Sequence, residues 1–355
     1  MTENATILIP DISGFTEFVT RTELDHSSHI INELLNLIIS QNYSGFSLSE
    51  IEGDAVLFYK KGDILSKQLL VKQCLDIFSK FHEQLKYIER DVVCRCGACQ
   101  SASHLSLKFI IHYGTIKEFR IADIVKASGI DMIIAHRLLK NNINSNEYIL
   151  ISSSCLNGLS DKEETSGLKW RTHIEKYPAI GDIVVEFADL QEIKKGIPPI
   201  PERKTYVRHE GGDTMEIEIE ATIEEVYQKL IDLDSIPKWM VGVTGIKRDI
   251  GVERIGTKHI CMTPSLEMEV ELDYAEFMED TAIVVNKFNI RSLGISGVGT
   301  DYLKKIDDNT TLLTDTGIWE IPDEFRQEML ASSRMSLEFF KALCEGKEIN
   351  KEVME

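Results

Sequence analysis

The stretch ILIPDISGFTEF, residues 7 to 18, decides how the chain begins to fold. Its apolar run predicts a short buried strand that ends on an acid, Asp11, and then turns through Ser13 and Gly14 before a helix. A buried strand seldom finishes on a carboxylate unless that edge of the sheet meets solvent, a metal or a ligand. Asp11 is therefore the first candidate for a functional residue.

The residues after this stretch predict a layered α+β domain. Apolar residues at helical spacing predict one long helix within residues 15 to 42 and another over residues 63 to 90. Between them, two β-like runs meet at Glu52-Gly53, which is the signal of a tight hairpin. Further β-like runs and a helix follow before residue 190. The order βαββαβαβ predicts a sheet that is covered on one face by helices.

A proline-rich stretch divides the chain into two halves. KKGIPPIPERK, residues 194 to 204, holds three of the eight prolines and has no apolar periodicity, so it predicts a semi-rigid linker. We therefore expect two domains of ordinary size. The expected ranges are 1–192 for the first domain, 193–205 for the linker, 206–346 for the second domain and 347–355 for a tail.

Charge and composition exclude several classes of function. The 355 residues carry a formal net charge of -19, which argues against nucleic acid or anionic lipid as a partner. A nucleotide can still bind if a divalent metal neutralises its phosphates. The N-terminus lacks the basic region of a signal peptide, and no stretch approaches 18 apolar residues. With seven cysteines, an odd number, these features predict a cytoplasmic protein with reduced thiols and no membrane contact.

Two aspartates form a candidate metal site. Asp11 and Asp54 both lie at strand ends next to glycine-containing turns, and adjacent strands would bring them together. Carboxylate oxygens suit Mg²⁺ or Mn²⁺, and the backbone N–H groups of Phe15 and Thr16 at a helix start could hold phosphates. The alternative is that both aspartates only cap turns and face solvent.

A cysteine cluster forms a second candidate metal site. CRCGACQSASH places Cys94, Cys96 and Cys99 within six residues, with His104 five residues further on. Such closely spaced thiolates can surround a structural Zn²⁺, with His104, Cys74 or His82 as the fourth ligand. The alternative is a group of reduced thiols in a surface loop.

The motifs DISGFTEF (11–18) and EIEGDAVLF (50–58) together resemble the metal-binding signature of class III nucleotidyl cyclases, over residues 5 to 190. The resemblance implies a ferredoxin-like α/β sandwich, a head-to-tail homodimer and a nucleoside triphosphate as substrate. It implies that Asp11 and Asp54 are metal ligands and that Glu50 lies where the family selects the purine. A carboxylate there can accept hydrogen bonds from guanine.

The later cyclase motif is only partly present. IDMIIAHRLLKN keeps a substrate-contacting arginine at Arg137, but Ile133 stands where the family has asparagine. We expect Ile133 to be buried and unable to hydrogen-bond the ribose. Lys176 is the nearest match to the family's triphosphate-binding lysine. These departures predict a weak or degenerate cyclase, or a domain that only binds nucleotide.

The second half resembles the START-like (SRPBCC) superfamily of helix-grip folds. The resemblance rests on alternating strands, on ATIEEVYQKLIDLDSIPKWM (221–240) and on an amphipathic C-terminal helix. It implies a curved antiparallel sheet around that helix, enclosing a cavity for an apolar small molecule. The alternative is that the same side chains simply fill a core. The side chains expected to line the cavity are Trp239, Met262, Met268, Phe288, Trp319 and Met335.

The sequence therefore predicts a divergent cyclase-like domain, which binds a nucleoside triphosphate with divalent metal, joined to a ligand-binding domain. One alternative is a catalytically inactive nucleotide-binding protein. Another is a lipid or small-molecule carrier that uses the cyclase-like half as a dimerisation scaffold.

Overall fold

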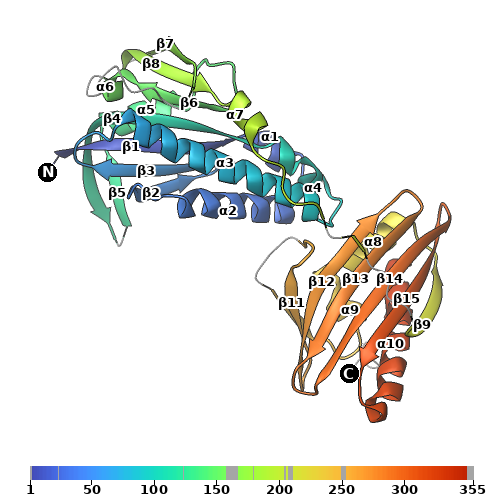
Figure 1. The fold of residues 1–355 in the computed structure, drawn as a ribbon. Coiled ribbons are helices and arrows are strands. Elements are labelled where there is room, and N and C mark those ends of the chain that lie inside the picture. The colour runs from blue at the N-terminus through green and yellow to red at the C-terminus, as the bar shows by residue number, and fades with distance from the viewer. Residues whose placement is uncertain are drawn as a thin grey trace. The chain divides into compact units, whose positions relative to one another are not determined.

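A computed structural model describes residues 2–22, 24–122, 124–156, 167–178, 180–203, 205–206, 211–248 and 253–349. The chain separates into two compact units (Figure 1). The first unit comprises Met1–Arg90 and Cys96–Pro201, and the second comprises Asp91–Arg95 and Glu202–Glu355. Both units combine helices with antiparallel strands, so the predicted α+β class is confirmed.

The first unit is built on an eight-stranded sheet in the order β2-β3-β1-β4-β6-β8-β7, with β5 paired to β4. The pair β4–β6 is parallel and the others are antiparallel. The strands are β1 (Thr2–Ser13), β2 (Ser47–Glu52), β3 (Ala55–Lys61), β4 (Ser106–Ile121), β5 (Ile124–Ser128), β6 (Tyr148–Ser152), β7 (Trp170–Tyr177) and β8 (Gly181–Asp189).

Helices α2 and α3 run along one face of this sheet (Figure 1). The predicted first helix is divided into α1 and α2. The helices of the unit are α1 (Phe15–Thr20), α2 (Leu24–Ser40), α3 (Lys67–Asp91), α4 (Gly97–Ser101), the 3-10 turn η1 (Ala102–His104), α5 (Ile130–Leu138), α6 (Ser153–Leu156) and α7 (Gln191–Gly196).

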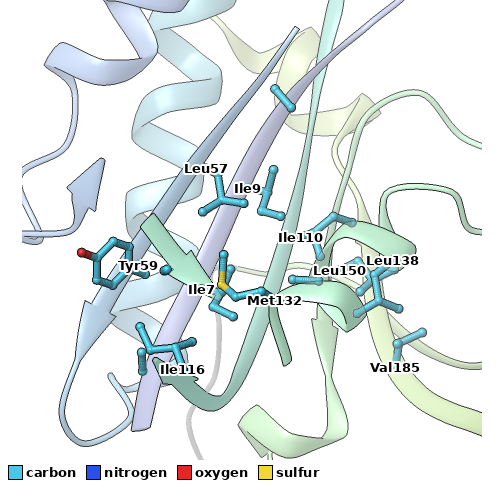
Figure 2. Packing of buried hydrophobic residues seen from close by; sticks show 14 of the residues in the cluster. Ile7, Ile9, Leu57, Tyr59, Ile110, Ile116, Met132, Leu138, Leu150 and Val185 are labelled. Atoms are coloured by element: carbon cyan, nitrogen blue, oxygen red, sulfur yellow. The ribbon is translucent and has the colours of Figure 1, made fainter. Parts of the chain in front are cut away.

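The opposite face of the sheet is also covered. Figure 2 shows apolar side chains of β1, β3 and β4 packed with Met132 and Leu138 of α5. Nine consecutive residues of β1 are buried, on alternating sides of the strand. The prediction of a sheet covered on only one face was therefore wrong, because the short helix α5 closes the second face.

The half-buried carboxylate of Asp131 holds α5 against the sheet. One oxygen of Asp131 accepts a hydrogen bond from the Thr115 amide at 2.7 Å, and the other lies 2.9 Å from His112 Nε2. Burial lowers the pKa of His112, so this histidine is neutral near pH 7. A Cβ at Gly114 would lie 2.1 Å from Asp131 Cγ, so the close approach of α5 requires glycine there.

The hairpin and the linker differ in how well the sequence predicted them. The tight turn at Glu52-Gly53 is confirmed, because Gly53 takes a φ of 63° between β2 and β3. The first residues of the predicted linker, 193–196, instead form the end of helix α7. Lys86 of α3 then donates to the carbonyls of Ile197 and Pro198 at 2.8 and 3.1 Å. This part of the proline-rich segment therefore packs onto the first unit.

The second unit is a seven-stranded antiparallel sheet in the order β10-β11-β12-β13-β14-β15-β9. A capping box at Thr222 and Glu225 begins α8, and Trp239 of α9 packs edge-on against Phe340 of α10 at 5.0 Å between ring centroids. The elements are β9 (Asp213–Ile219), α8 (Ile223–Ile231), η2 (Leu233–Ser235), α9 (Ile236–Trp239), β10 (Gly245–Arg248), β11 (Lys258–Met262), β12 (Glu267–Phe277), β13 (Thr281–Ile290), β14 (Ile295–Asp307), β15 (Thr310–Glu320) and α10 (Asp323–Cys344).

This unit is not continuous in sequence. Val92 forms a β-bridge with Arg254, and the Tyr227 hydroxyl donates to the Val93 carbonyl at 3.1 Å. The segment 91–95 therefore belongs with the second unit, although it follows α3 of the first. Within the described residues, no helix has the length and apolar character that crossing a membrane requires.

Candidate functional site

The end of β1 brings two carboxylates and one lysine together. Asp11 is 8% exposed, and the amide of Ile12 donates to the Asp54 carbonyl at 3.1 Å. Lys108 lies opposite Asp11 in the β1–β4 register, and its Nζ is 2.9 Å from Asp11 Oδ2. The predicted pair of aspartates therefore shares one corner of the sheet with a lysine.

The charges in this corner are not balanced. Burial, and next the neighbouring charge of Asp11, raise the pKa of Asp54 to about 6, while Lys108 lowers it by less. Two carboxylates against one ammonium group leave a net negative charge when all three are ionised. The oxygen donors fit Mg²⁺ or Mn²⁺, although Lys108 must yield part of its contact with Asp11.

The helix that follows Asp11 is shorter than the sequence suggested. Phe15 and Thr16 begin α1, which has only six residues, and no side chain caps its first turn at Gly14. Thr16 is exposed and Phe15 is half-buried. The amides of this turn remain beside Asp11, but so short a helix adds little dipole to them.

The residues expected to contact the base and the ribose lie on β2 and α5. Glu50 Oε2 is 2.5 Å from Lys126 Nζ, and the ligand atoms of Glu50, Glu52 and His136 lie within 4.8 Å of one another. Ile133 is 52% exposed, so the expectation that it is buried was wrong. Arg137 is exposed one helical turn later.

Lys176, the candidate for a triphosphate-binding lysine, lies on β7. Its Nζ is 4.0 Å from Asp182 Oδ2, and its side chain is largely exposed. Nothing in this contact connects Lys176 to Asp11 or Asp54.

The cysteine cluster gathers around a histidine from α2. The Nδ1 atom of His26 is 3.2 Å from Cys96 Sγ and 3.6 Å from Cys99 Sγ. The ligand atoms of His26, Cys96 and Cys99, all of the first unit, lie within 4.8 Å of one another. Thiols and an imidazole are donors that hold tetrahedral Zn²⁺.

The fourth candidate ligand is therefore His26, which the sequence did not suggest. His104 is exposed at the end of η1 and lies outside this group. Cys74 and His82 are buried in α3, where His82 Nε2 is 3.3 Å from Ser106 Oγ and packs against Phe78 and Phe81. His26 lies 70 residues from Cys96, and no local spacing signals that pairing.

The second unit contains a cavity of about 480 Å³ between its sheet and α10. Four of the six expected side chains line it, namely Trp239, Met268, Phe288 and Trp319. Met262 and Met335 line other surface hollows instead.

The sequence reasoning missed two acids in this cavity, Asp301 and Asp315. A signal was present, because Asp315 has the same strand phase as the buried Leu313 and the cavity-lining Trp319. An acid on the apolar phase of a strand is unusual enough to mark a functional position.

Comparisons with known proteins find similarity over parts of the chain. The model of the family "Protein of unknown function (DUF2652)" matches residues 31–148. Two solved structures are similar at low identity. The guanylate cyclase domain of RhGC from Catenaria anguillulae in complex with GTP is 16% identical, with a TM-score of 0.38, covering 53% of this chain and 97% of that one. The adenylyl cyclase CyaB from P. aeruginosa is 16% identical, with a TM-score of 0.36, covering 53% and 94%.

One curated relative has a closer sequence match. It is the uncharacterized protein Rv2561/Rv2562 of Mycobacterium tuberculosis (strain ATCC 25618 / H37Rv). The two sequences are 30% identical over 149 residues, which cover 41% of this chain and 67% of the relative. The chain belongs to the same protein family as Rv2561/Rv2562.

Proposed function

We propose that the first unit is a divergent class III nucleotidyl cyclase-type domain that binds a purine nucleoside triphosphate with Mg²⁺ or Mn²⁺. The observation that carries this proposal is the meeting of Asp11 and Asp54 at the end of β1, with Lys108 as the ammonium group beside Asp11. Paired carboxylates at a corner of the sheet suit a hard cation that also binds phosphate oxygens.

Each residue of the proposed site has a chemical task. Asp11 and Asp54 would hold the metal, which when bound supplies Lewis-acid stabilisation of phosphate charge. Glu50, once released from Lys126, can accept hydrogen bonds from the purine edge. Arg137 can donate to phosphate oxygens in a bidentate manner. Lys108 can move from Asp11 to a phosphate without leaving the corner.

The proposed site lacks one of the groups that turnover requires. Ile133 is exposed on α5 one turn before Arg137, so it has access to a substrate but no hydrogen-bonding group to orient the ribose. We therefore propose a site that binds nucleotide and forms cyclic product slowly. The alternative without turnover keeps the same binding residues.

We also propose that the first unit forms a homodimer. Exposed apolar side chains lie on β2, β4, β5 and α5, and β5 is in contact with the other three elements. A connected apolar surface of this kind usually marks an interface, and a second copy would cover it. The side chains are Leu48, Ile51, Phe119, Val125, Ile130 and Ile133.

We propose that the group around His26 holds a structural Zn²⁺, with Cys96 and Cys99 as further ligands. Cys94, two residues before Cys96 in the sequence, is the proposed fourth ligand. Thiolate ligands require a reducing compartment, which agrees with the proposed cytoplasmic location.

We propose a separate role for the second unit as a START-like domain that binds a small molecule in its cavity.

Replacing Asp54 by asparagine should weaken metal-dependent nucleotide binding about 10-fold or more, because one anionic metal ligand is lost. The measurement is titration of a fluorescent GTP analogue with and without Mn²⁺. Asp63→Asn, at an exposed position after β3, is the matched control. Binding that is unaffected by both Mn²⁺ and Asp54→Asn would rule out the proposed metal site.

Replacing Ile133 by asparagine should raise the rate of cyclic nucleotide formation about 10-fold, because it restores a hydrogen-bonding group near the ribose. Ile174→Asn makes the same change at an exposed isoleucine of β7, outside the proposed interface, and should leave the rate unchanged. Product is quantified by mass spectrometry with each of the four nucleoside triphosphates. Equal rates in all three proteins would favour the binding-only alternative.

Mixing two defective chains tests the dimer. Asp54→Asn and Arg137→Ala should each weaken nucleotide binding, and an equimolar mixture should regain part of it. This is expected because one site of a head-to-tail heterodimer contains both native residues. If the mixture binds no better than the average of its components, the two residues do not act across an interface between copies.

Purified protein should contain about one zinc ion per chain by elemental analysis. His26→Ala should lower the zinc content and the thermal stability together, because metal binding is coupled to folding. His104→Ala, which changes an exposed histidine outside the group, should do neither. Zinc retained fully in His26→Ala would exclude this histidine as a ligand.

A further inference from the structure

The cavity of the second unit has an apolar wall made possible by glycines. A Cβ on Gly317 would lie 2.1 Å from Trp319 Nε1, and one on Gly299 would lie 2.8 Å from Phe288 Cε2. The two rings can therefore lie directly against the sheet, with centroids 5.2 Å apart. Both rings line the cavity, where an aromatic face can contact an apolar group or a cation.

Two carboxylates lie beside this aromatic wall. Asp301 of β14 and Asp315 of β15 are directly opposite each other in the antiparallel register, and both line the cavity. Like charges placed opposite each other on a sheet repel. Two acids in this position are costly unless something in the cavity compensates them.

No positive group compensates them among the described residues. Within the described residues, neither Asp301 nor Asp315 forms an ion pair. The residues that line this cavity include no lysine or arginine, but they do include a third acid, Glu328 of α10. Burial raises the pKa of both Asp301 and Asp315, and the neighbouring charge of Asp315 raises that of Asp301 further. A carboxylate or phosphate ligand would add negative charge beside these acids, so the cavity disfavours an anion.

A buried histidine next to the cavity indicates that the ligand has a second polar group. His259 is 5% exposed, and neither ring nitrogen has a hydrogen-bond partner among the described residues. It lines an inner chamber of about 70 Å³ together with Asn286 and Asp301. That chamber shares Trp239, Phe288 and Asp301 with the main cavity. A buried imidazole without a partner is rare and indicates that a polar ligand atom belongs there.

We propose that this cavity binds a small amphiphilic cation, with a primary ammonium group between Asp301 and Asp315 and an aromatic or alkyl body against Phe288 and Trp319. A hydroxyl or amide of the ligand would meet His259. The inference rests on the proposed role of the second unit in binding a small molecule, and it replaces the purely apolar ligand with a cationic one. The volume of about 480 Å³ suits one or two rings with a short amine chain.

The test compares three probes of nearly the same shape on the full chain by isothermal titration calorimetry. Tryptamine is a cation, 3-ethylindole is neutral and indole-3-acetate is an anion. Tryptamine should bind at least about 10-fold more tightly than 3-ethylindole, since hydrogen bonds to a charged group are the strong ones. Indole-3-acetate should not bind measurably.

Variants assign the charge preference to the two acids. Asp315→Asn should lower the affinity for tryptamine about 10-fold or more and leave that for 3-ethylindole unchanged. Asp308→Asn, at an exposed aspartate paired with Lys305, is the matched control and should change neither affinity. Circular dichroism of each variant shows whether its fold is intact.

The outcomes separate this inference from the proposed function. If tryptamine and 3-ethylindole bind equally, or if Asp315→Asn has no effect, the cationic ligand class is wrong and the binding role of the second unit stands. If none of the three probes binds, both the ligand class and the proposed binding role are overturned.

Discussion

The ion pair between Asp11 and Lys108 is the interaction on which the first unit depends. β1 is buried on both faces up to its last residue, so the carboxylate of Asp11 lies inside the protein and must be compensated there. Lys108 on the adjacent strand supplies one positive charge at 2.9 Å. Asp54 joins the same corner through the β2–β3 hairpin and leaves an excess of negative charge when all three groups are ionised. That excess is the basis of the metal site that we propose.

The second unit shows the same constraint in another form. Asp301 and Asp315 face each other across β14 and β15, but no lysine or arginine lines their cavity among the described residues. In the first unit the protein provides a partial counter-ion, whereas in the second we infer that the ligand provides it. Two like charges placed side by side lower the stability of a protein in the absence of ligand. In both units, a bound cation would therefore reduce the repulsion between the paired carboxylates.

Local sequence predicted those parts that depend on neighbouring residues. The hairpin at Glu52-Gly53 follows from the positive φ that glycine accepts, and the helical spacing over residues 63–90 gave α3 (Lys67–Asp91). It failed where distant segments meet. Helix α5 covers the second face of the sheet because Asp131 can approach Gly114. The segment 91–95 pairs with Arg254, which lies far along the chain. Neither contact leaves a periodic signal.

The sequence by itself determined the α+β class, and it predicted two domains, an aspartate pair and a thiol cluster, because each of these depends on the type and local spacing of residues. Only the tertiary structure decided their environments. It placed Lys108 beside Asp11, His26 beside Cys96 and Cys99, and Ile133 at the surface. It also set Asp301 against Asp315 in one cavity. Strand register and helix packing fix these contacts, and they join residues whose separation along the chain carries no information about their distance in space.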